Sequence, residues 1–273
     1  MPGASDVSLD AMIADILRSA NYKHICPDLI RTVASQEMMK RRSYKETVKA
    51  IKNKLHQVGG AYLDGRNEYT LWLARLQEAV ESKEQETLRQ CCRDVMRHHA
   101  STRERLPILD QFYETIFADI GPVQSVLDLA CGLHPFALPW LRLTLDAKYY
   151  AFDIYQHMME FLREWFVLMH VDGYADTCDL SQSCPLQQVD VALVLKTLPC
   201  LEQIDKAASL RLLQKVNARY VIVSFPIQSL GGKAKGMSTY YEEHFWKLIG
   251  HESWSVRKVE FSTELVFVDQ KEK

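Results

Sequence analysis

Apolar residues recur at helical spacing through the first 120 residues of the 273-residue chain. One stripe consists of Met12, Ile13, Ile16 and Leu17, and another consists of Val48, Ile51, Leu55 and Val58. Residues three or four apart share one face of a helix. Ser43, with Glu46 three positions on, forms a capping-box pattern before the second stripe. Ser101 or Thr102 caps a further expected helix. The pattern predicts a helical N-terminal domain over residues 1–100.

The pattern changes after Gly121-Pro122, where short apolar runs alternate with helical or loop segments. The runs are "SVLDLA", "YYAFD", "DVALVLK" and "YVIVSFP". Such alternation is typical of a parallel sheet covered by helices. The end of the chain, "SVRKVEFSTELVFVDQ", has two β-rich runs around Ser262-Thr263, which predict a closing hairpin. We therefore expect an α/β domain over residues 101–273, with a mostly parallel sheet and an antiparallel C-terminal hairpin.

Composition fits an ordinary globular protein, with 47% hydrophobic and 25% charged residues. The seven cysteines are odd in number and include no C-x-x-C pair, so neither a disulfide framework nor a metal site is indicated. The start has no signal-peptide pattern, and no apolar run is long enough to span a bilayer. We expect a cytoplasmic protein without membrane contact, and nothing in the sequence indicates an obligate protein partner.

A basic stretch stands out in a chain whose net charge is −2. Residues 23–56 hold nine lysines and arginines against three acids. Lys45, Lys49 and Lys52 recur at three- to four-residue steps, so they share one helix face. A solvated face and a surface for a polyanion both fit this charge pattern.

The stretch "VLDLACGLHPFALP", residues 126–139, predicts a strand that runs into a sharp turn. Ligands of open α/β sheets bind beyond the carboxyl ends of the strands, at such turns. A dinucleotide site needs G-x-G-x-x-G, and here Gly132 is the single glycine. S-adenosylmethionine carries no phosphate, so its turn must admit a methionyl and a ribose group but need not cradle an anion. The turn therefore favours S-adenosylmethionine over a nicotinamide dinucleotide.

Acidic residues follow successive predicted strands. Asp128 lies at the turn, Asp153 closes "YYAFD", and Asp179 lies in "TCDLS". Asp153 stands where a carboxylate accepts hydrogen bonds from ribose hydroxyls, and Asp179 is placed to meet an adenine amino group. Each acid alone is more often a surface or capping residue. Together, at successive strand ends, they predict a nucleoside site.

Seven segments together resemble the Arm/Rmt group of aminoglycoside-resistance 16S ribosomal RNA methyltransferases. They are "LHQVGGAYL", "HASTRERLPILDQFY", "LDLACGLHPFALP", "AFDI", "LVLKTLPCLE", "SFPIQSLGGKAKGM" and "STELVFV". The resemblance implies a class I, Rossmann-like fold that methylates N7 of guanine 1405 in the decoding A-site of the 30S subunit. It also implies resistance to 4,6-disubstituted deoxystreptamines such as gentamicin and amikacin.

The resemblance also implies roles for single residues. It implies that Arg105 contacts the methionyl carboxylate, that Asp153 contacts the ribose, and that Asp179 and Leu180 contact the adenine. The other residues that it places around S-adenosylmethionine are Tyr62, His99, Ala100, Ser101, Ala130, Gly132 and Gln203, with Leu195 and Lys196 at the rim near the methyl group. His134 departs from the family pattern, where asparagine is frequent.

Methylation of guanine N7 needs no general base, because this nitrogen has a free lone pair and no proton. We therefore expect catalysis by alignment, with no catalytic acid or base. The flipped guanine stacks on an apolar or aromatic side chain, for which Phe225 and Trp140 are candidates, although both residue types more often belong to the core. Cys200 in "LPC" is the candidate for a covalent route and is more often a small buried hydrophobe.

Contacts with RNA phosphates are expected from Lys233 and Lys235 in "SLGGKAKGM" and from the Lys45, Lys49 and Lys52 face. Two alternatives of other classes stay open at this point. A small-molecule methyltransferase would bind the same cofactor but ignore 30S particles. A non-catalytic rRNA-binding protein would bind 30S and lose nothing when Asp153 is removed.

Overall fold

A computed structural model describes residues 8–40, 43–63, 68–228 and 236–271. Within these residues, seven strands form one sheet in the order β3-β2-β1-β4-β5-β7-β6. The strands are β1 Val123–Leu129, β2 Leu143–Asp153, β3 Asp172–Thr177, β4 Val189–Leu195, β5 Ala218–Pro226, β6 Trp254–Glu260 and β7 Glu264–Lys271. Strands β1 to β5 pair in parallel, whereas β7 pairs antiparallel to both β5 and β6. The predicted parallel sheet and closing hairpin are confirmed.

The sheet forms where apolar runs are buried on both faces. Strand β4 reads "VDVALVL" and is buried at all positions but Asp190, which fits a central parallel strand. Strand β3, "DGYADT", has no matching apolar run. It lies at the edge of the sheet, where Tyr174 is exposed and polar residues are tolerated. Hydrophobicity alone therefore misses this strand.

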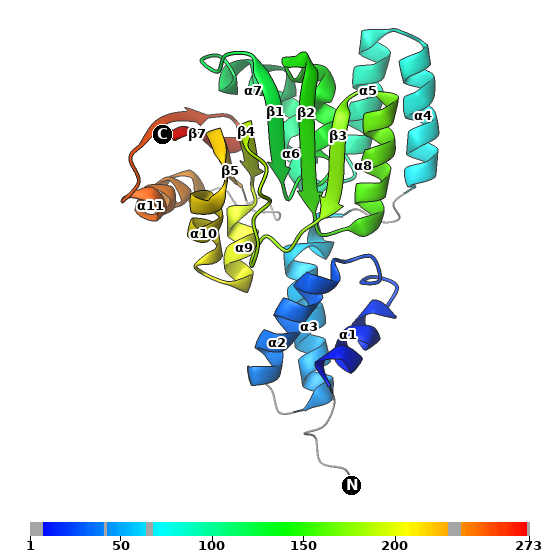
Figure 1. The fold of residues 1–273 in the computed structure, drawn as a ribbon, viewed down its shortest axis with the longest axis vertical. Helices are drawn as coiled ribbons and strands as arrows, with labels where there is room; N and C mark the ends of the chain where they lie inside the picture. The colour runs from blue at the N-terminus through cyan, green and yellow to red at the C-terminus, as the bar shows by residue number, and fades with distance from the viewer. Residues whose placement is uncertain (1–7, 41–42, 64–67, 229–235, 272–273) are drawn as a thin grey trace.

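Helices α1 Leu9–Leu17, α2 Pro27–Lys40 and α3 Tyr44–Val58 form a helical lobe beyond one end of the sheet (Figure 1). Ser43 caps α3 as predicted, because its hydroxyl accepts a hydrogen bond from the Glu46 N–H and donates one to the Glu46 carboxylate. The 3₁₀ turn η1 Gly60–Tyr62 follows. No helix among the described residues is long and apolar enough to cross a membrane.

The other helices surround the sheet (Figure 1). They are α4 Tyr69–Glu81, α5 Gln85–Met96, α6 Ala100–Arg105, α7 Leu109–Ile116, α8 Gln156–Leu168, α9 Leu198–Ile204, α10 Ala208–Lys215 and α11 Met237–Ile249, with 3₁₀ turns η2 Leu106–Ile108 and η3 His134–Trp140. The predicted cap of α6 is wrong. The helix begins at Ala100 after His99, and Thr102 instead donates to the Met96 carbonyl.

Helices α4 and α5 pack beside the sheet, although they precede residue 100. In Figure 1 they stand next to α8, away from α1–α3. The Trp72 ring of α4 contacts Phe161 of α8, and the Arg93 guanidinium of α5 lies 5.1 Å from the centre of the Trp140 ring. The division of the chain at residue 100 stays a prediction. The packing associates only α1–α3 and η1 with the separate lobe.

The helical lobe is tied to the carboxyl end of β2 by the main chain. The Cys26 N–H donates to the Ile154 carbonyl at 2.7 Å, and the Gln156 N–H donates to the His24 carbonyl at 2.8 Å. The two bonds flank Tyr155, which lies two residues after Asp153 and bridges to Ile25. The segment between α1 and α2 is therefore held at the edge of the sheet where ligands bind.

Candidate functional site

A cavity of about 710 Å³, part of it open to solvent, lies where the helical lobe meets the carboxyl ends of the strands. One side comes from the sheet, and the other comes from the helical lobe. We call the first the sheet wall (Ala130, Asp153, Asp179 and Leu195) and the second the helical wall (Leu29, Val58, Gly59 and Tyr62).

Most residues expected around the cofactor line this cavity. They are Tyr62, His99, Ser101, Ala130, Asp153, Asp179, Leu180, Leu195 and Lys196. Ala100, Arg105, Gly132 and Gln203 do not line it. The Gln203 carbonyl accepts a hydrogen bond from Lys54 at 3.0 Å, which links α9 to α3. The expected roles of these residues stay predictions.

The turn after β1 needs its single glycine. Gly132 has φ +52°, and a Cβ there would lie 2.6 Å from Cε1 of His99. Ala130, two residues earlier, also has a left-handed φ of 54°, which is uncommon for a residue with a side chain. The Gly132 N–H donates to Oδ2 of Asp153 at 2.9 Å. The turn therefore holds a carboxylate of the neighbouring strand, and it does so with main-chain atoms.

Asp153 ends β2 and is almost fully buried. Its Oδ1 accepts the Ile154 N–H at 2.6 Å, so each carboxylate oxygen receives one main-chain hydrogen bond. Burial raises the pKa of Asp153 to about 6, and the main-chain hydrogen bonds oppose that rise. The carboxylate keeps acceptor capacity for a further donor, such as a ribose hydroxyl.

Asp179 follows β3 and is fixed from two sides. Its Oδ1 accepts the Ser181 N–H at 3.0 Å and the Ser181 hydroxyl at 2.6 Å. Its Oδ2 accepts the Thr32 hydroxyl of α2 at 2.7 Å. Sequence reasoning missed Thr32, because a lone threonine on a helix gives no local signal of a partner 147 residues away.

Two aromatic groups join the lobes at the cavity. The rings of Tyr62 and His99 stack with centres 6.0 Å apart, and the Tyr62 hydroxyl lies 3.1 Å from Sγ of Cys200. Burial and the nearby Lys196 lower the pKa of His99 to about 4, so its ring is neutral at pH 7. Its buried Nδ1 has no hydrogen-bond partner among the described residues. Such an atom suits a site that receives a polar ligand.

Cys200 lines the cavity but lacks the character of a nucleophile. Burial raises the pKa of its thiol, whereas the contact with Tyr62 acts in the opposite direction. A reactive cysteine needs the thiolate at neutral pH. The covalent route is therefore disfavoured by the environment of this residue.

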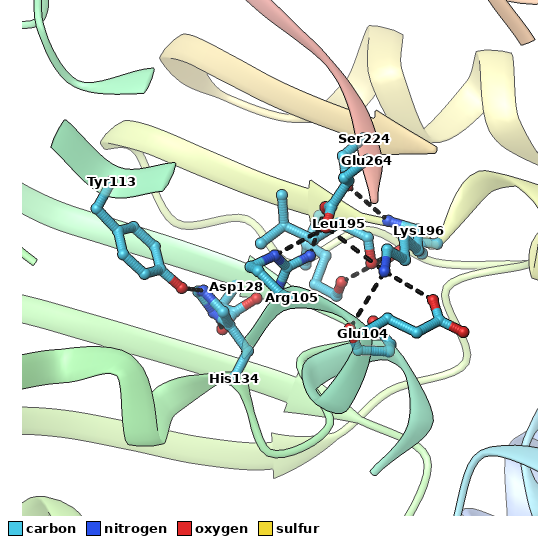
Figure 2. A network of polar contacts seen from close by, with 12 residues as sticks. Glu104, Arg105, Tyr113, Asp128, His134, Leu195, Lys196, Ser224 and Glu264 are labelled. Carbon is cyan, nitrogen blue, oxygen red and sulfur yellow. Dashed lines mark hydrogen bonds and ion pairs between the residues drawn. The ribbon is translucent and has the colours of Figure 1, made fainter. Parts of the chain in front are cut away.

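A buried ionic network joins α6 and β7 to Lys196, which lines the cavity (Figure 2). The Arg105 guanidinium is fully buried and donates to both carboxylate oxygens of Glu264, at 3.0 and 2.5 Å. The Lys196 ammonium lies 2.8 Å from Glu104 and 3.4 Å from Glu264. Nη1 of Arg105 has no hydrogen-bond partner among the described residues. Because Arg105 does not line the cavity, a contact between this guanidinium and a ligand carboxylate stays a prediction.

A second buried cluster supports the turn after β1 (Figure 2). The Tyr113 hydroxyl lies 2.5 Å from Nε2 of His134, and Nδ1 of His134 lies 2.6 Å from Oδ2 of Asp128. The Tyr149 hydroxyl donates to the same oxygen at 2.7 Å. His134 thus has a structural role, in which its two ring nitrogens join η3 to β1 through Asp128 and to α7 through Tyr113.

The two aromatic candidates for stacking on the guanine are core residues. Phe225 is fully buried and stacks on Tyr241, with ring centres 4.9 Å apart. Trp140 is buried, and its indole N–H donates to Asp110 at 2.7 Å. Neither side chain is free to stack on a base. The stacking hypothesis for these two residues is therefore wrong.

The expected RNA-binding lysines fall into different classes. Lys45 and Lys49 of α3 are exposed. Lys52 is half-buried, because its ammonium donates to the Ser19 hydroxyl at 3.2 Å and lies over the Tyr22 ring. Lys233 and Lys235 lie outside the described residues. Lys45 and Lys49 are thus the exposed part of the proposed face.

Comparison with known proteins gives matches over nearly the whole chain. The ribosomal RNA methyltransferase (FmrO) family matches residues 18–268. A 16S rRNA (guanine(1405)-N(7))-methyltransferase from Micromonospora rosea is 34% identical over 268 residues, which are 97% of this chain and 98% of that protein. An enzyme of the same name from Serratia marcescens is 32% identical over 97% of this chain and 99% of its own length.

Solved structures give the same result. The 16S rRNA methyltransferase RmtF in complex with S-adenosyl-L-homocysteine superposes with a TM-score of 0.81 at 27% identity and covers 98% of this chain and 99% of its own. The 16S rRNA methylase RmtB has a TM-score of 0.77 at 27% identity, covering 98% and 100%. With its strand order, single-glycine turn and acid-lined cavity, this chain belongs to the S-adenosylmethionine-dependent ribosomal RNA methyltransferase family FmrO.

Proposed function

We propose that the protein transfers a methyl group from S-adenosylmethionine to N7 of guanine 1405 in 16S rRNA of the 30S subunit. The observation that carries the proposal is the full-length similarity to relatives named for this reaction, at 34% and 32% identity. The enzyme would act in the cytoplasm, where its ribosomal substrate is found. Methylation would give resistance to 4,6-disubstituted deoxystreptamines.

The cavity offers groups for the nucleoside part of the cofactor. Bound S-adenosylmethionine supplies an electrophilic methyl group on a sulfonium. Asp153 has acceptor capacity for the ribose hydroxyls, and Asp179 has it for the adenine amino group. The expected contact of Arg105 with the methionyl carboxylate has less support, because its guanidinium is fully buried, pairs with Glu264 and does not line the cavity. Binding by Asp153 and Asp179 would fix the orientation of the cofactor, and with it the direction in which the methyl group points.

The chemistry of guanine N7 fits the ionisable groups around the cavity. N7 loses no proton on methylation, so the reaction needs no base. His99 is neutral and buried, and burial keeps Cys200 a thiol. The protein therefore accelerates transfer by holding guanine N7, the methyl carbon and the sulfur in line. This contribution reaches about 7–11 kcal/mol in well-aligned systems.

The exposed lysines of α3 support a role in docking to rRNA. Lys45 and Lys49 lie on the helical lobe that also carries one wall of the cavity. Phosphate contacts by lysine are salt-dependent, because binding releases condensed counterions. Changing Lys45 and Lys49 to glutamate should weaken 30S binding and reduce its salt dependence while S-adenosylhomocysteine affinity stays the same. Unchanged 30S affinity would remove this role.

The reaction itself is tested with tritiated S-adenosylmethionine and purified bacterial 30S subunits. Label mapped to N7 of guanine 1405 by borohydride-aniline cleavage is the expected result, and expression in a susceptible bacterium should raise gentamicin resistance. Label on small molecules but not on 30S would favour a small-molecule methyltransferase. Binding of 30S that Asp153→Ala leaves unchanged, without any methyl transfer, would favour a non-catalytic rRNA-binding protein.

A further inference from the structure

Thr32 links the helical lobe to the sheet wall through a single side-chain hydrogen bond. Its hydroxyl donates to Oδ2 of Asp179 at 2.7 Å. A threonine within a helix commonly donates to the carbonyl four residues earlier on its own helix. Here the hydroxyl reaches across to another part of the fold, one turn after Leu29, which lines the cavity. The face of α2 that carries Leu29 and Thr32 therefore borders the site.

The hydrogen bonds around Asp179 leave one position open. Oδ1 receives two donors from Ser181, the N–H and the hydroxyl, so its lone pairs are occupied. Oδ2 receives the Thr32 hydroxyl and keeps one lone pair. Asp179 and Leu180 both line the cavity. The remaining acceptor site is on the oxygen that Thr32 holds.

We propose that Thr32 is a positioning residue for adenine recognition, because it fixes the Asp179 oxygen that accepts the adenine amino group. This inference rests on the proposed function, since it takes S-adenosylmethionine as the ligand of the cavity. The amino group is the feature that distinguishes adenine from hypoxanthine, which carries a carbonyl oxygen at that position. A fixed carboxylate accepts from the amino group and opposes the carbonyl oxygen, which is itself an acceptor.

The placement of Thr32 also makes the helical lobe part of the cofactor site. The main-chain bonds from Cys26 to Ile154 and from Gln156 to His24 hold the start of α2 beside Asp153. Thr32 extends that attachment to Asp179. The lobe with the exposed lysines of α3 is thereby connected to both acids of the sheet wall. Cofactor binding should therefore stabilise α2.

The test compares two ligands on three variants by calorimetry. The ligands are S-adenosylhomocysteine and S-inosylhomocysteine, which differ in the amino group of the base. Thr32→Val removes the hydroxyl and keeps the shape, whereas Thr32→Ser keeps the hydroxyl. Thr47→Val is the matched control, because the hydroxyl of the buried Thr47 donates to the carbonyl of Ser43, the cap residue of α3, away from the cavity lining.

We expect wild type to bind S-adenosylhomocysteine more tightly than S-inosylhomocysteine. In Thr32→Val the ratio of the two affinities should fall about fivefold, because a carboxylate oxygen that is no longer held in place loses about the free energy of one hydrogen bond to the amino group. Thr32→Ser should restore the preference for S-adenosylhomocysteine. Thr47→Val should lower the melting temperature and leave that preference unchanged. Hydrogen exchange over residues 27–40 should slow when wild type binds S-adenosylhomocysteine, and less so in Thr32→Val.

Two results would overturn the inference alone. One is an unchanged preference in Thr32→Val, and the other is an equal loss of affinity for both ligands, as a purely structural role predicts. Wild type that binds neither ligand would instead overturn the proposed function, and this inference with it. Because the assay contains no 30S particles, an error in the assigned RNA substrate leaves its result unaffected.

Discussion

On the sheet wall of the cavity, two carboxylates accept main-chain N–H groups, whereas the helical wall is apolar except for the Tyr62 hydroxyl and is attached by a few hydrogen bonds. Asp153 receives two main-chain N–H groups and ends the strand ladder, and Tyr155, two residues later, bridges to Ile25. The helical wall contacts the sheet side through bonds such as those from Thr32 to Asp179 and from Lys54 to Gln203.

The difference separates two tasks within one site. A wall that continues a parallel sheet cannot shift without breaking strand pairing, so it keeps the cofactor groups in place. A wall held by few bonds moves at a lower cost in free energy, and it belongs to the lobe that carries the exposed lysines. Changes to the sheet wall should therefore affect folding and cofactor affinity together, whereas changes to the lobe should separate them.

The largest effect is expected from Glu264→Gln, which breaks the ionic support behind the sheet wall. Arg105 and Glu264 are both fully buried, and Lys196 shares the same carboxylate. Loss of this charge leaves two buried cations with less compensation, and breaking a buried pair costs about 3–5 kcal/mol. Urea unfolding measures the free energy of unfolding.

Glu114→Gln is the control, because its ion pair with Arg142 is exposed and should contribute little. An equal loss of unfolding free energy in Glu264→Gln and Glu114→Gln would show that burial of the ion pair does not matter.

Gly132→Ala should distort the turn of the sheet wall. The new Cβ would lie 2.6 Å from the His99 ring at a left-handed φ, and the N–H of this residue holds Asp153. Such strain is worth about 1–3 kcal/mol, so affinity for S-adenosylhomocysteine should fall about tenfold. Calorimetry measures this loss. Gly121→Ala, where a Cβ meets nothing within 4 Å, should bind as wild type does. Full affinity in Gly132→Ala would show that the turn adapts.

The pH dependence of cofactor binding tests Asp153 directly. Burial raises the pKa of Asp153 to about 6, above its value of 3.8 in an unfolded chain. Folding alone therefore favours the protonated form, and this contribution to stability is lost as the pH rises through 6. Ribose hydroxyls favour the ionised form, so affinity for S-adenosylhomocysteine should increase severalfold between pH 5 and pH 7.5.

Asp153→Asn supplies the control for that dependence. It keeps the shape of the side chain and removes the titration, so its affinity should be weaker and flat across the same pH range. Calorimetry at several pH values follows both proteins. A variant that retains the full slope would mean that another group controls the pH dependence.

The sheet wall could be predicted from the sequence in part, because parallel strands bring their carboxyl ends together. Asp153 ends a strand with an apolar run, so the topology alone places it at this edge, whereas β3, which precedes Asp179, has no such run. The capping box of Ser43 and Glu46 is equally local, and the structure contains it. Features that depend on residues close together in the chain can be predicted from a single sequence.

The contacts between distant segments could not be predicted in this way. Glu264 pairs with Arg105 across 159 positions, and Thr32 meets Asp179 across 147. No periodicity indicates either partner, because both depend on how the lobe and the hairpin pack. Phe225 and Trp140 show the same limit, since their aromatic character fits a stacking surface and a core equally well.

The smallest effect is expected from Ser43→Ala, which weakens the helical lobe at the end of α3 that lies away from the cavity lining. The Ser43 hydroxyl accepts the Glu46 N–H, and loss of such a cap costs about 1 kcal/mol. The melting temperature should fall by about 2–4 °C, as a protein of this size responds to that loss. Affinity for S-adenosylhomocysteine should stay unchanged, because Val58 and Tyr62 lie at the opposite end of the helix or beyond it. Ser43→Thr, which keeps a hydroxyl at the cap, should melt within about 1 °C of wild type. A parallel loss of affinity in Ser43→Ala would mean that the helical wall responds to strain anywhere in α3, and that the two walls are more tightly coupled than their contacts indicate.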